Sequence, residues 1–171
     1  MTGTLSIILS FASYAFVILA MFRLFRINYF NPIVKIFATY LEPISKSIFF
    51  FLNPLLAALA LALLVQFVSF YLAYSSGYEP LTLLFISIIN VINSCFRILF
   101  YCVIGSVILS WVAPGNNHPL LQIVEEMSGA ILQPIRKFVP PMGGLDFTPI
   151  IGLMLLNLIN TSFIQIISSM V

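Results

Sequence analysis

The chain has 171 residues, of which 61% are hydrophobic and only 7% are charged. Soluble domains carry about 25% charged residues, so this composition excludes a soluble globular protein and predicts an integral membrane protein. The net charge of +2 is too small to indicate a nucleic-acid-binding protein.

Four hydrophobic stretches predict four membrane spans, at about 5–22, 49–74, 81–112 and 148–171. A helix needs about 20 apolar residues to cross a bilayer, so the third stretch is too long for one upright helix. We expect it to divide into a surface or tilted lead-in over 81–95 and a span over 96–113. The first stretch has its basic residues after the apolar run, which predicts an uncleaved span with an outside N-terminus.

Two segments between these stretches, residues 31–48 and 118–139, alternate apolar and polar residues with a helical period. In the first segment Glu42 and Lys46 belong to the wet face, and their i, i+4 spacing supports a helix. Both segments are too polar to span a membrane and too amphipathic to be plain loops. We expect two amphipathic helices that lie in the membrane interface or dip into the membrane as re-entrant hairpins.

The two halves of the chain align without gaps when Pro32 is placed on Pro119, and several isoleucines then coincide. Each half reads as span, amphipathic helix, span, so we expect two tandem repeats, at 1–80 and 81–171. Because each repeat has two spans, both face the same way. The predicted fold class is an all-α membrane protein with about four transmembrane helices in two parallel repeats, each with an amphipathic interfacial or re-entrant helix.

Basic residues concentrate in the two connections that contain the amphipathic segments. By the positive-inside rule these connections are cytoplasmic, and both termini lie outside the cytoplasm. Six of the seven basic residues follow this pattern: Arg23, Arg26, Lys35, Lys46, Arg136 and Lys137.

The stretch PPMGGLDFTP, at 140–149, separates a basic pair from the last hydrophobic run. Its prolines end the preceding helix, and its adjacent glycines allow a sharp reversal of the chain. Thr148 and Pro149 predict the N-cap and the first position of the last span. The stretch is therefore a turn that returns the chain into the membrane, or else part of a docking or lipid-contact surface. The residues of that alternative surface are Arg136, Lys137, Gly143, Gly144 and Asp146.

One basic residue, Arg97, lies inside a hydrophobic stretch. If it is deep in the bilayer it needs a partner or a water-filled cavity, and the nearest candidates in sequence are Asn90, Asn93 and Glu79. Asn90 and Asn93 share its helical face and would form an intramembrane polar cluster with it. If the lead-in lies on the membrane instead, Arg97 snorkels to the outer surface, which is the interpretation we favour. The sole histidine, His118, precedes a proline and predicts a loop or N-cap position.

Residues 108–160 carry a pattern of the form S-W … P … P-[IL]-R-[RK] … P-x-M-G-G-[IL]-D-x-[ST]-P. This stretch closely resembles the YGGT family of small integral membrane proteins, called YlmG in some lineages. The first half matches loosely, because residues 47–50 stand where members carry P-L-R-R. The resemblance implies a plasma-membrane or plastid-membrane location, here the cell (inner) membrane. The matching residues are Ser110, Trp111, Pro119, Pro134, Arg136, Lys137, Pro140, Met142, Gly143, Gly144, Asp146 and Pro149.

The sequence contains no P-loop, H-E-x-x-H or G-x-S-x-G motif, so we expect no enzyme and assign no catalytic, cofactor or metal residues. The resemblance implies roles near cell division, nucleoid organisation, membrane-complex assembly or osmotic stress. We expect a non-enzymatic assembly or organising factor. Its partners are the lipid bilayer and other membrane proteins or further copies of itself, and not nucleic acid. The alternative is a transport or channel subunit linked to osmotic or ion homeostasis, which internal duplication and the polar residues near Arg97 would suit.

Overall fold

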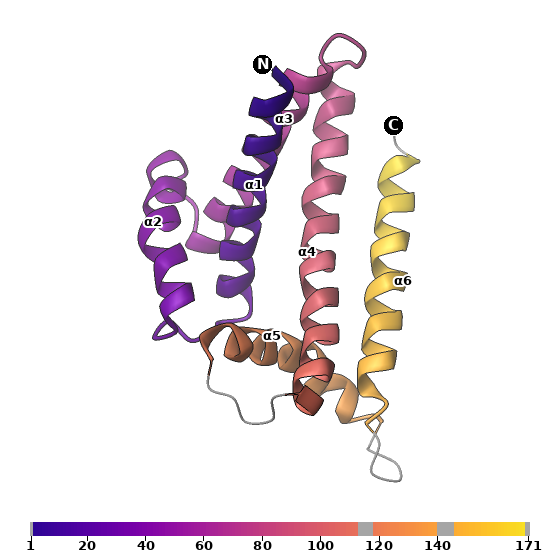
Figure 1. The fold of residues 1–171 in the computed structure, drawn as a ribbon. Helices are drawn as coiled ribbons and strands as arrows, with labels where there is room; N and C mark the ends of the chain where they lie inside the picture. The colour runs from indigo at the N-terminus through magenta and orange to yellow at the C-terminus, as the bar shows by residue number, and fades with distance from the viewer. Residues whose placement is uncertain (1, 113–117, 140–145, 170–171) are drawn as a thin grey trace.

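The computed structural model describes residues 2–112, 118–139 and 146–169, and these residues form six α-helices (Figure 1). Four of the six, α1, α3, α4 and α6, are long and apolar enough to cross a membrane. For this part of the chain, the prediction of an all-helical protein with four candidate membrane spans is confirmed. The helices are α1 (Thr2–Leu24), α2 (Pro32–Ile48), α3 (Pro54–Tyr74), α4 (Pro80–Val112), α5 (Pro119–Arg136) and α6 (Thr148–Ser168).

The candidate spans stand roughly side by side and alternate in direction along the chain. α1 and α4 run away from the end of the bundle that holds the N-terminus, and α3 and α6 run back towards it (Figure 1). Both ends of the chain therefore lie at the same end of the bundle. An even number of spans requires this arrangement.

The predicted division of residues 81–112 is wrong, because α4 is one uninterrupted helix of 33 residues. The stretch contains no proline and a single glycine, Gly105, so nothing in it breaks the hydrogen-bond ladder. At about 1.5 Å per residue, α4 is about 50 Å long. The second span begins at Pro54 rather than at residue 49, because the Asn53 side chain caps α3 by accepting a hydrogen bond of 2.8 Å from the Leu56 amide.

α1 and α3 pack closely through small residues. Ala57, Ala58 and Ala62 on α3 are fully buried, which lets the two backbones approach each other. The Ser13 hydroxyl of α1 donates to the Ala62 carbonyl at 2.7 Å, so the polar group that enters this contact has a partner. Such contacts are typical of helix pairs inside membranes, where Ser and Ala replace the large residues of soluble cores.

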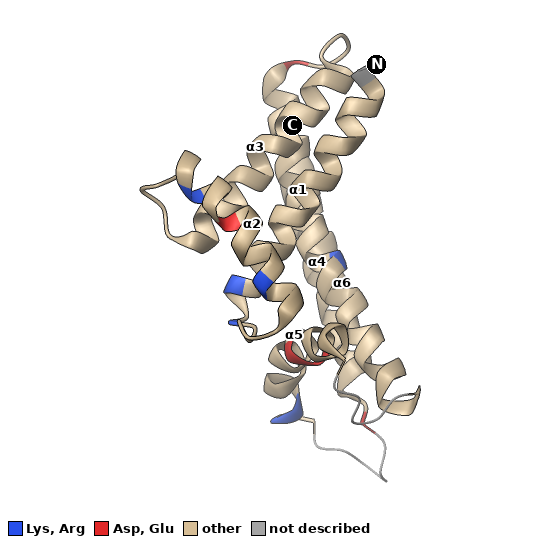
Figure 2. Ribbon diagram, turned by 60° about the vertical axis from the view of Figure 1, so that its left-hand side comes forward, with Lys and Arg blue, Asp and Glu red and all other residues tan. Residues whose placement is uncertain are grey.

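The two predicted amphipathic helices are present, and they lie differently. α5 crosses the end of the bundle that is opposite the termini, whereas α2 runs beside α1, more along the spans than across them (Figures 1 and 2). Each begins with proline at the first turn behind a side-chain cap. Asn31 accepts from the Ile33 amide at 3.0 Å, and His118 accepts from the Leu120 amide at 3.3 Å, which confirms the N-cap prediction for the histidine.

Hydrogen bonds connect the start of α2 with α5. The Asn31 side chain donates to the Pro119 carbonyl at 2.7 Å, and the backbone amide of Asn28 donates to the Glu126 carboxylate at 2.9 Å. The two connections between spans are thus joined to each other at one end of the bundle.

The prediction that Glu42 lies on the wet face of α2 is wrong, since this residue is buried against the end of α1. Its carboxylate pairs with Arg23 and, at 2.9 Å, with the Lys46 ammonium, which confirms the predicted i, i+4 contact. Burial raises the pKa of the Glu42 carboxyl, but hydrogen bonds from Arg23 and Lys46 outweigh it and hold the pKa below its ordinary value. A buried carboxylate is tolerated here because two cations neutralise it.

Candidate functional site

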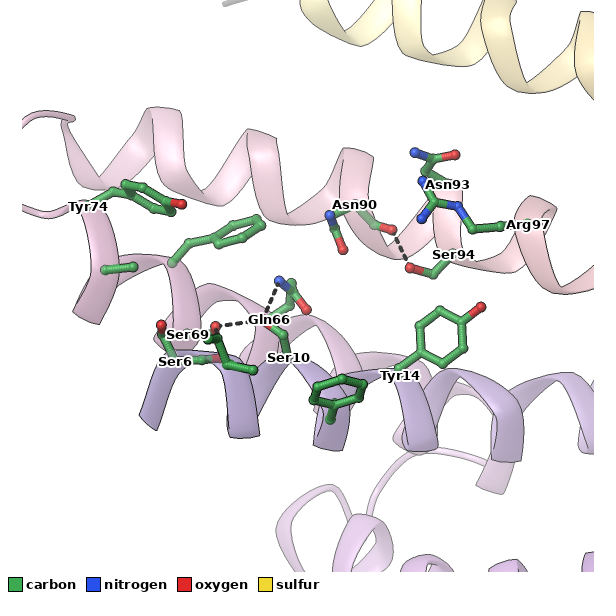
Figure 3. Close-up of a pocket in the computed structure, with 14 residues that line it drawn as sticks. Ser6, Ser10, Tyr14, Gln66, Ser69, Tyr74, Asn90, Asn93, Ser94 and Arg97 are labelled. Carbon is green, nitrogen blue, oxygen red and sulfur yellow. Dashed lines mark hydrogen bonds between the residues drawn. The ribbon is translucent and has the colours of Figure 1, made fainter. Parts of the chain in front are cut away.

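A polar cleft of about 430 Å³ lies between α1, α3 and α4, within the candidate spans (Figure 3). Hydrocarbon cannot hydrogen-bond to amides or hydroxyls, so a cluster of such groups inside spans indicates a functional site more strongly than it would in a soluble protein. The polar side chains that line it are Ser6, Ser10, Tyr14, Gln66, Ser69, Asn90, Asn93, Ser94 and Arg97.

Part of this lining forms a hydrogen-bonded network between α1 and α3. The hydroxyls of Ser10 and Ser69 are 2.8 Å apart, and Ser69 also donates to the Ser6 carbonyl at 2.7 Å. The Gln66 amide reaches Ser10 at 3.5 Å. Across the cleft, the Asn90 side chain points from α4 towards Gln66 (Figure 3), and it forms no hydrogen bond with the residues that the structure describes.

Arg97 and Asn93 lie together on the side of α4 that faces α6 (Figure 3). There they line a second cleft of about 230 Å³, whose lining includes Asn157 and Asn160 of α6. The Asn160 amide nitrogen donates to the Asn93 side-chain oxygen at 3.0 Å, which links the two helices. The side-chain oxygen of Asn160 is buried, and no partner for it is found among the described residues.

Arg97 lies midway along the candidate spans. It lines the same cleft as Tyr14, which stands midway along α1. Arg97 is therefore level with the middle of the first candidate span. The continuity of α4 keeps residues 81–95 in line with the rest of the helix. The structure brings Asn90, Asn93 and Arg97 together around the two clefts.

Sequence reasoning missed the partners that α1, α3 and α6 bring to this cluster. A signal was present in the first span, because Ser6, Ser10 and Ser13 recur at helical spacing within an apolar run. In α6, Asn157 and Asn160 are likewise spaced three residues apart. Helical periodicity can indicate which residues share a face, but it does not show which other helix that face meets.

The second predicted site lies where α5 leads into α6. A guanidinium nitrogen of Arg136 is 2.9 Å from the Asp146 carboxylate. The other oxygen of that carboxylate accepts from the Thr148 amide at 2.9 Å. α6 begins at Thr148 itself, so the prediction of Thr148 as N-cap is wrong by one residue, and Asp146 supplies the capping oxygen. Hydrogen bonds from Thr148, followed by those from Arg136, lower the pKa of the Asp146 carboxyl.

Of the residues predicted to form a docking surface, these contacts involve Arg136 and Asp146. Arg136 and Asp146 satisfy each other and line a cleft of about 490 Å³ between α4, α5 and α6, while Lys137 is exposed at the end of α5. Gly143 and Gly144 lie outside the described residues. The structure therefore gives Asp146 and Arg136 a role in starting α6.

Comparison with known proteins places this chain in a family. The CCB3/YggT family model matches residues 85–167. An uncharacterised protein of Pseudomonas aeruginosa is 36% identical over 86% of this chain and 80% of its own length. An uncharacterised protein of Haemophilus influenzae is 26% identical over 85% of this chain and 81% of its own length. The uncharacterised protein YggT of Escherichia coli K12 is 32% identical over 42% of this chain and 38% of its own length.

No solved structure matches the chain. The family model covers the second half, from within α4 to the end of α6, and the Pseudomonas relative extends the similarity over most of the first half. With four candidate membrane spans and these relatives, the chain belongs to the CCB3/YggT family of membrane proteins.

Proposed function

We propose that this protein is a non-enzymatic assembly factor of the cell (inner) membrane, which binds other membrane-spanning helices through α6. The observation that carries this proposal is a polar stripe on α6, formed by Thr161 and Gln165 and continued by Asn157 at the edge of the smaller cleft. These side chains are exposed, and they form no hydrogen bond with the described residues. Their spacing of four residues puts them on one face of the helix.

Such a stripe is unfavourable against lipid. Burying an amide or hydroxyl without a hydrogen bond costs about 2–7 kcal/mol, depending on the reference state. α6 contacts only α4 and α5 within the described part of the chain, so its outer face has no partner there. Polar side chains that hydrogen-bond between helices are a recognised source of helix association in membranes. A helix of another subunit, or of a second copy of this chain, would supply the missing partners.

Crosslinking from α6 in native membranes tests this proposal. A photoreactive amino acid at Thr161 or Gln165 is expected to give protein crosslinks. The matched control position is Ile166, which is exposed on the same helix and lies about 180° from Asn157. It is expected to give mainly lipid adducts. The masses of the products distinguish a second copy from another membrane protein, and equal yields from Thr161 and Ile166 would contradict the proposal.

The proposed orientation puts α5 and the start of α2 in the cytoplasm and both termini outside. Six of the seven basic residues support it, since they lie in the last turn of α1, in the two connections that follow α1 and α5, or in α2 and α5 themselves (Figure 2). Reporter fusions at Val171 and after Pro54 test the orientation. An outside reporter at Val171 and a cytoplasmic one after Pro54 are expected, and the reverse pattern would overturn it.

The proposal includes a duplication of the chain at 1–80 and 81–171. Its support is the repeated order of a long helix, a helix that starts with proline behind a side-chain cap, and a second long helix. The connection into α6 is longer than the connection into α3, and it contains the glycine-rich stretch that the first half lacks. Expressing the two halves as separate chains tests the idea. Recovery of a complex between them is expected, and failure of both halves to insert would count against it.

A second candidate function is that of a transport or channel subunit. The observation that favours it is the polar cleft between α1, α3 and α4, because ionisable and amide groups within spans mark ion and substrate pathways in many membrane proteins. Ion-flux measurements on the purified protein in liposomes test it. A flux that Gln66→Leu and Asn90→Leu abolish would favour transport over assembly, whereas no flux above empty liposomes would exclude it.

A further inference from the structure

Arg97 carries a positive charge midway along the candidate spans, and no acidic side chain of the protein neutralises it. All five acidic residues fall in the described part of the chain, where none forms an ion pair with Arg97. Glu79 lies in the turn between α3 and α4, and Glu125 and Glu126 lie on α5 at the opposite end of the spans. Because arginine keeps its charge in proteins, a counter-charge for this exposed guanidinium would have to come from outside the chain.

The groups around Arg97 favour an anion over a cation. The Asn93 side-chain oxygen already accepts from Asn160, which leaves the Asn93 amide nitrogen as a free donor beside the guanidinium. Figure 3 shows both side chains on the same side of α4. The site thus presents N–H donors with one full positive charge, and the one unpartnered buried acceptor beside them in the described residues is the neutral side-chain oxygen of Asn160. A guanidinium binds phosphate or carboxylate oxygens through two parallel hydrogen bonds, and it binds them more strongly than neutral acceptors.

Two routes lead to this site. The larger cleft extends along the polar side chains from Ser6, in the first turns of α1, to Arg97, and this lining suits water and a dissolved anion. The smaller cleft lies between α4 and α6, and its walls include Phe96, Phe100 and Tyr101. An apolar wall beside a cation suits a lipid whose headgroup is anionic.

From this arrangement we infer that Arg97 and Asn93 form a binding site for an anionic oxygen group, phosphate or carboxylate, between α4 and α6. The ligand is a soluble anion that enters by the larger cleft or the headgroup of an anionic lipid that enters between the helices. The site depends neither on the association of α6 with a partner nor on transport.

Thermal unfolding of the purified full-length protein in a neutral detergent tests the inference. The probes are inorganic phosphate, compared with chloride at equal ionic strength, and short-chain phosphatidylglycerol, compared with phosphatidylcholine. Ligand at ten times its Kd is expected to raise Tm by about 3–5 °C. A shift with phosphate alone identifies a soluble anion, and a shift with phosphatidylglycerol alone identifies a lipid headgroup.

Two variants connect the shift to the site. Arg97→Gln removes the charge and is expected to abolish the shift. Asn93→Asp places a carboxylate four residues before Arg97, the favourable order for an ion pair on one helix. This variant is expected to have a raised Tm without ligand and no response to anions, so it remains informative if Arg97→Gln fails to fold. Lys35→Gln removes an exposed positive charge from α2 and serves as the matched control, with an unchanged shift expected.

Three results would overturn the inference. The first is a wild-type protein that responds to none of the anions. The second is an equal shift in the wild type and in Asn93→Asp. The third is an equal shift in the wild type and in Arg97→Gln. If no anion acts and a photoreactive residue at Asn93 crosslinks an acidic membrane helix, the counter-charge of Arg97 belongs to a partner protein, and the anion site is rejected.

Discussion

The helix pairs α1–α3 and α4–α6 are both antiparallel pairs of candidate spans, but they are packed by different means. In the most apolar window of α1, 44% of the residues are buried inside the chain, compared with 11% for α6. Alanines and serines hold α1 against α3, whereas an amide pair and the ring contact of Phe96 with Phe163 connect α4 with α6. The first pair is packed mainly by contacts within the chain. In the second pair, most of the α6 surface has no contact with the rest of the described residues.

This difference indicates which helices serve the fold and which serve an interaction. A membrane provides no hydrophobic driving force between apolar helices, so close packing and polar contacts decide how firmly two spans associate. α1 and α3 have both. α6 has few of these contacts, yet it carries polar groups on its outer face. We therefore expect substitutions in the first pair to reduce folding and substitutions on the outside of the second to leave folding intact.

The largest loss of stability is expected for Ala62→Leu, because Ala62 is fully buried where α1 packs against α3. The larger side chain has no space there, and overpacking of this kind costs about 2–3 kcal/mol. The measurement is the Tm of the detergent-solubilised protein, together with its abundance in membranes. Leu158→Ala, on the exposed side of α6, is the control and should leave both unchanged. Equal Tm values for the two variants would remove the distinction between the helix pairs.

A smaller loss of stability is expected for Gly152→Leu, which tests the contact between α6 and α5. A β-carbon at this position would lie 2.8 Å from the end of the Leu132 side chain. Leu132 can move to accommodate a methyl group but not a whole leucine, so the cost is about 1–2 kcal/mol. Gly152→Ala should lie close to wild type in the same unfolding measurement. A Gly152→Leu protein as stable as wild type would show that α6 is not fixed at this point.

The amide pair between α4 and α6 should contribute less than either of these packing contacts. Interhelical hydrogen bonds in membranes contribute about 0.6 kcal/mol on average, so Asn160→Leu should lower Tm only slightly. A double-mutant cycle with Asn93→Leu isolates the contribution of the pair. Additive effects of the two substitutions would mean that the 3.0 Å contact contributes nothing to stability.

The smallest effect is expected for Asp146→Asn, which removes the exposed ion pair with Arg136 but keeps an oxygen that can cap α6. The expected loss at neutral pH is about 0.3–1 kcal/mol.

The pH dependence of unfolding distinguishes the charge of Asp146 from its capping role. Because the folded protein lowers the pKa of Asp146, the stabilisation by its charge is complete above the ordinary value of 3.8 and is lost as the pH falls through the folded pKa. Below pH about 4 the gap between wild type and Asp146→Asn should therefore narrow. A constant gap at all pH values would show that the charge is not the cause.

The features that the sequence predicted correctly depend on local properties. Span length and hydropathy indicated the four long helices, and helical periodicity indicated the two amphipathic helices, α2 and α5. His118 was identified as a cap from its neighbours alone. The i, i+4 pair of Glu42 and Lys46 follows from helix geometry in the same way. Apart from the spans, each of these features depends on residues that lie within a few helical turns of one another.

The features that could not be predicted from the sequence depend on contacts between segments that are far apart along the chain. Nothing local to Glu42 shows that Arg23 reaches it from the end of α1, and this contact is the reason that the carboxylate is buried. Nothing local to Arg97 shows which side chains of other helices surround it and its polar neighbours Asn90 and Asn93. These neighbours are accommodated within the spans because Ser10, Gln66 and Asn160 provide polar groups on the helices that face them.

The hydrogen bonds that join the start of α2 to α5 also affect how the bundle can move. They fasten the two connections together at one end, while at the other end the first and second pairs of spans are joined by the short turn between α3 and α4. The two pairs of spans are therefore tied to each other at both ends, which limits how far they can separate along the cleft between α1, α3 and α4.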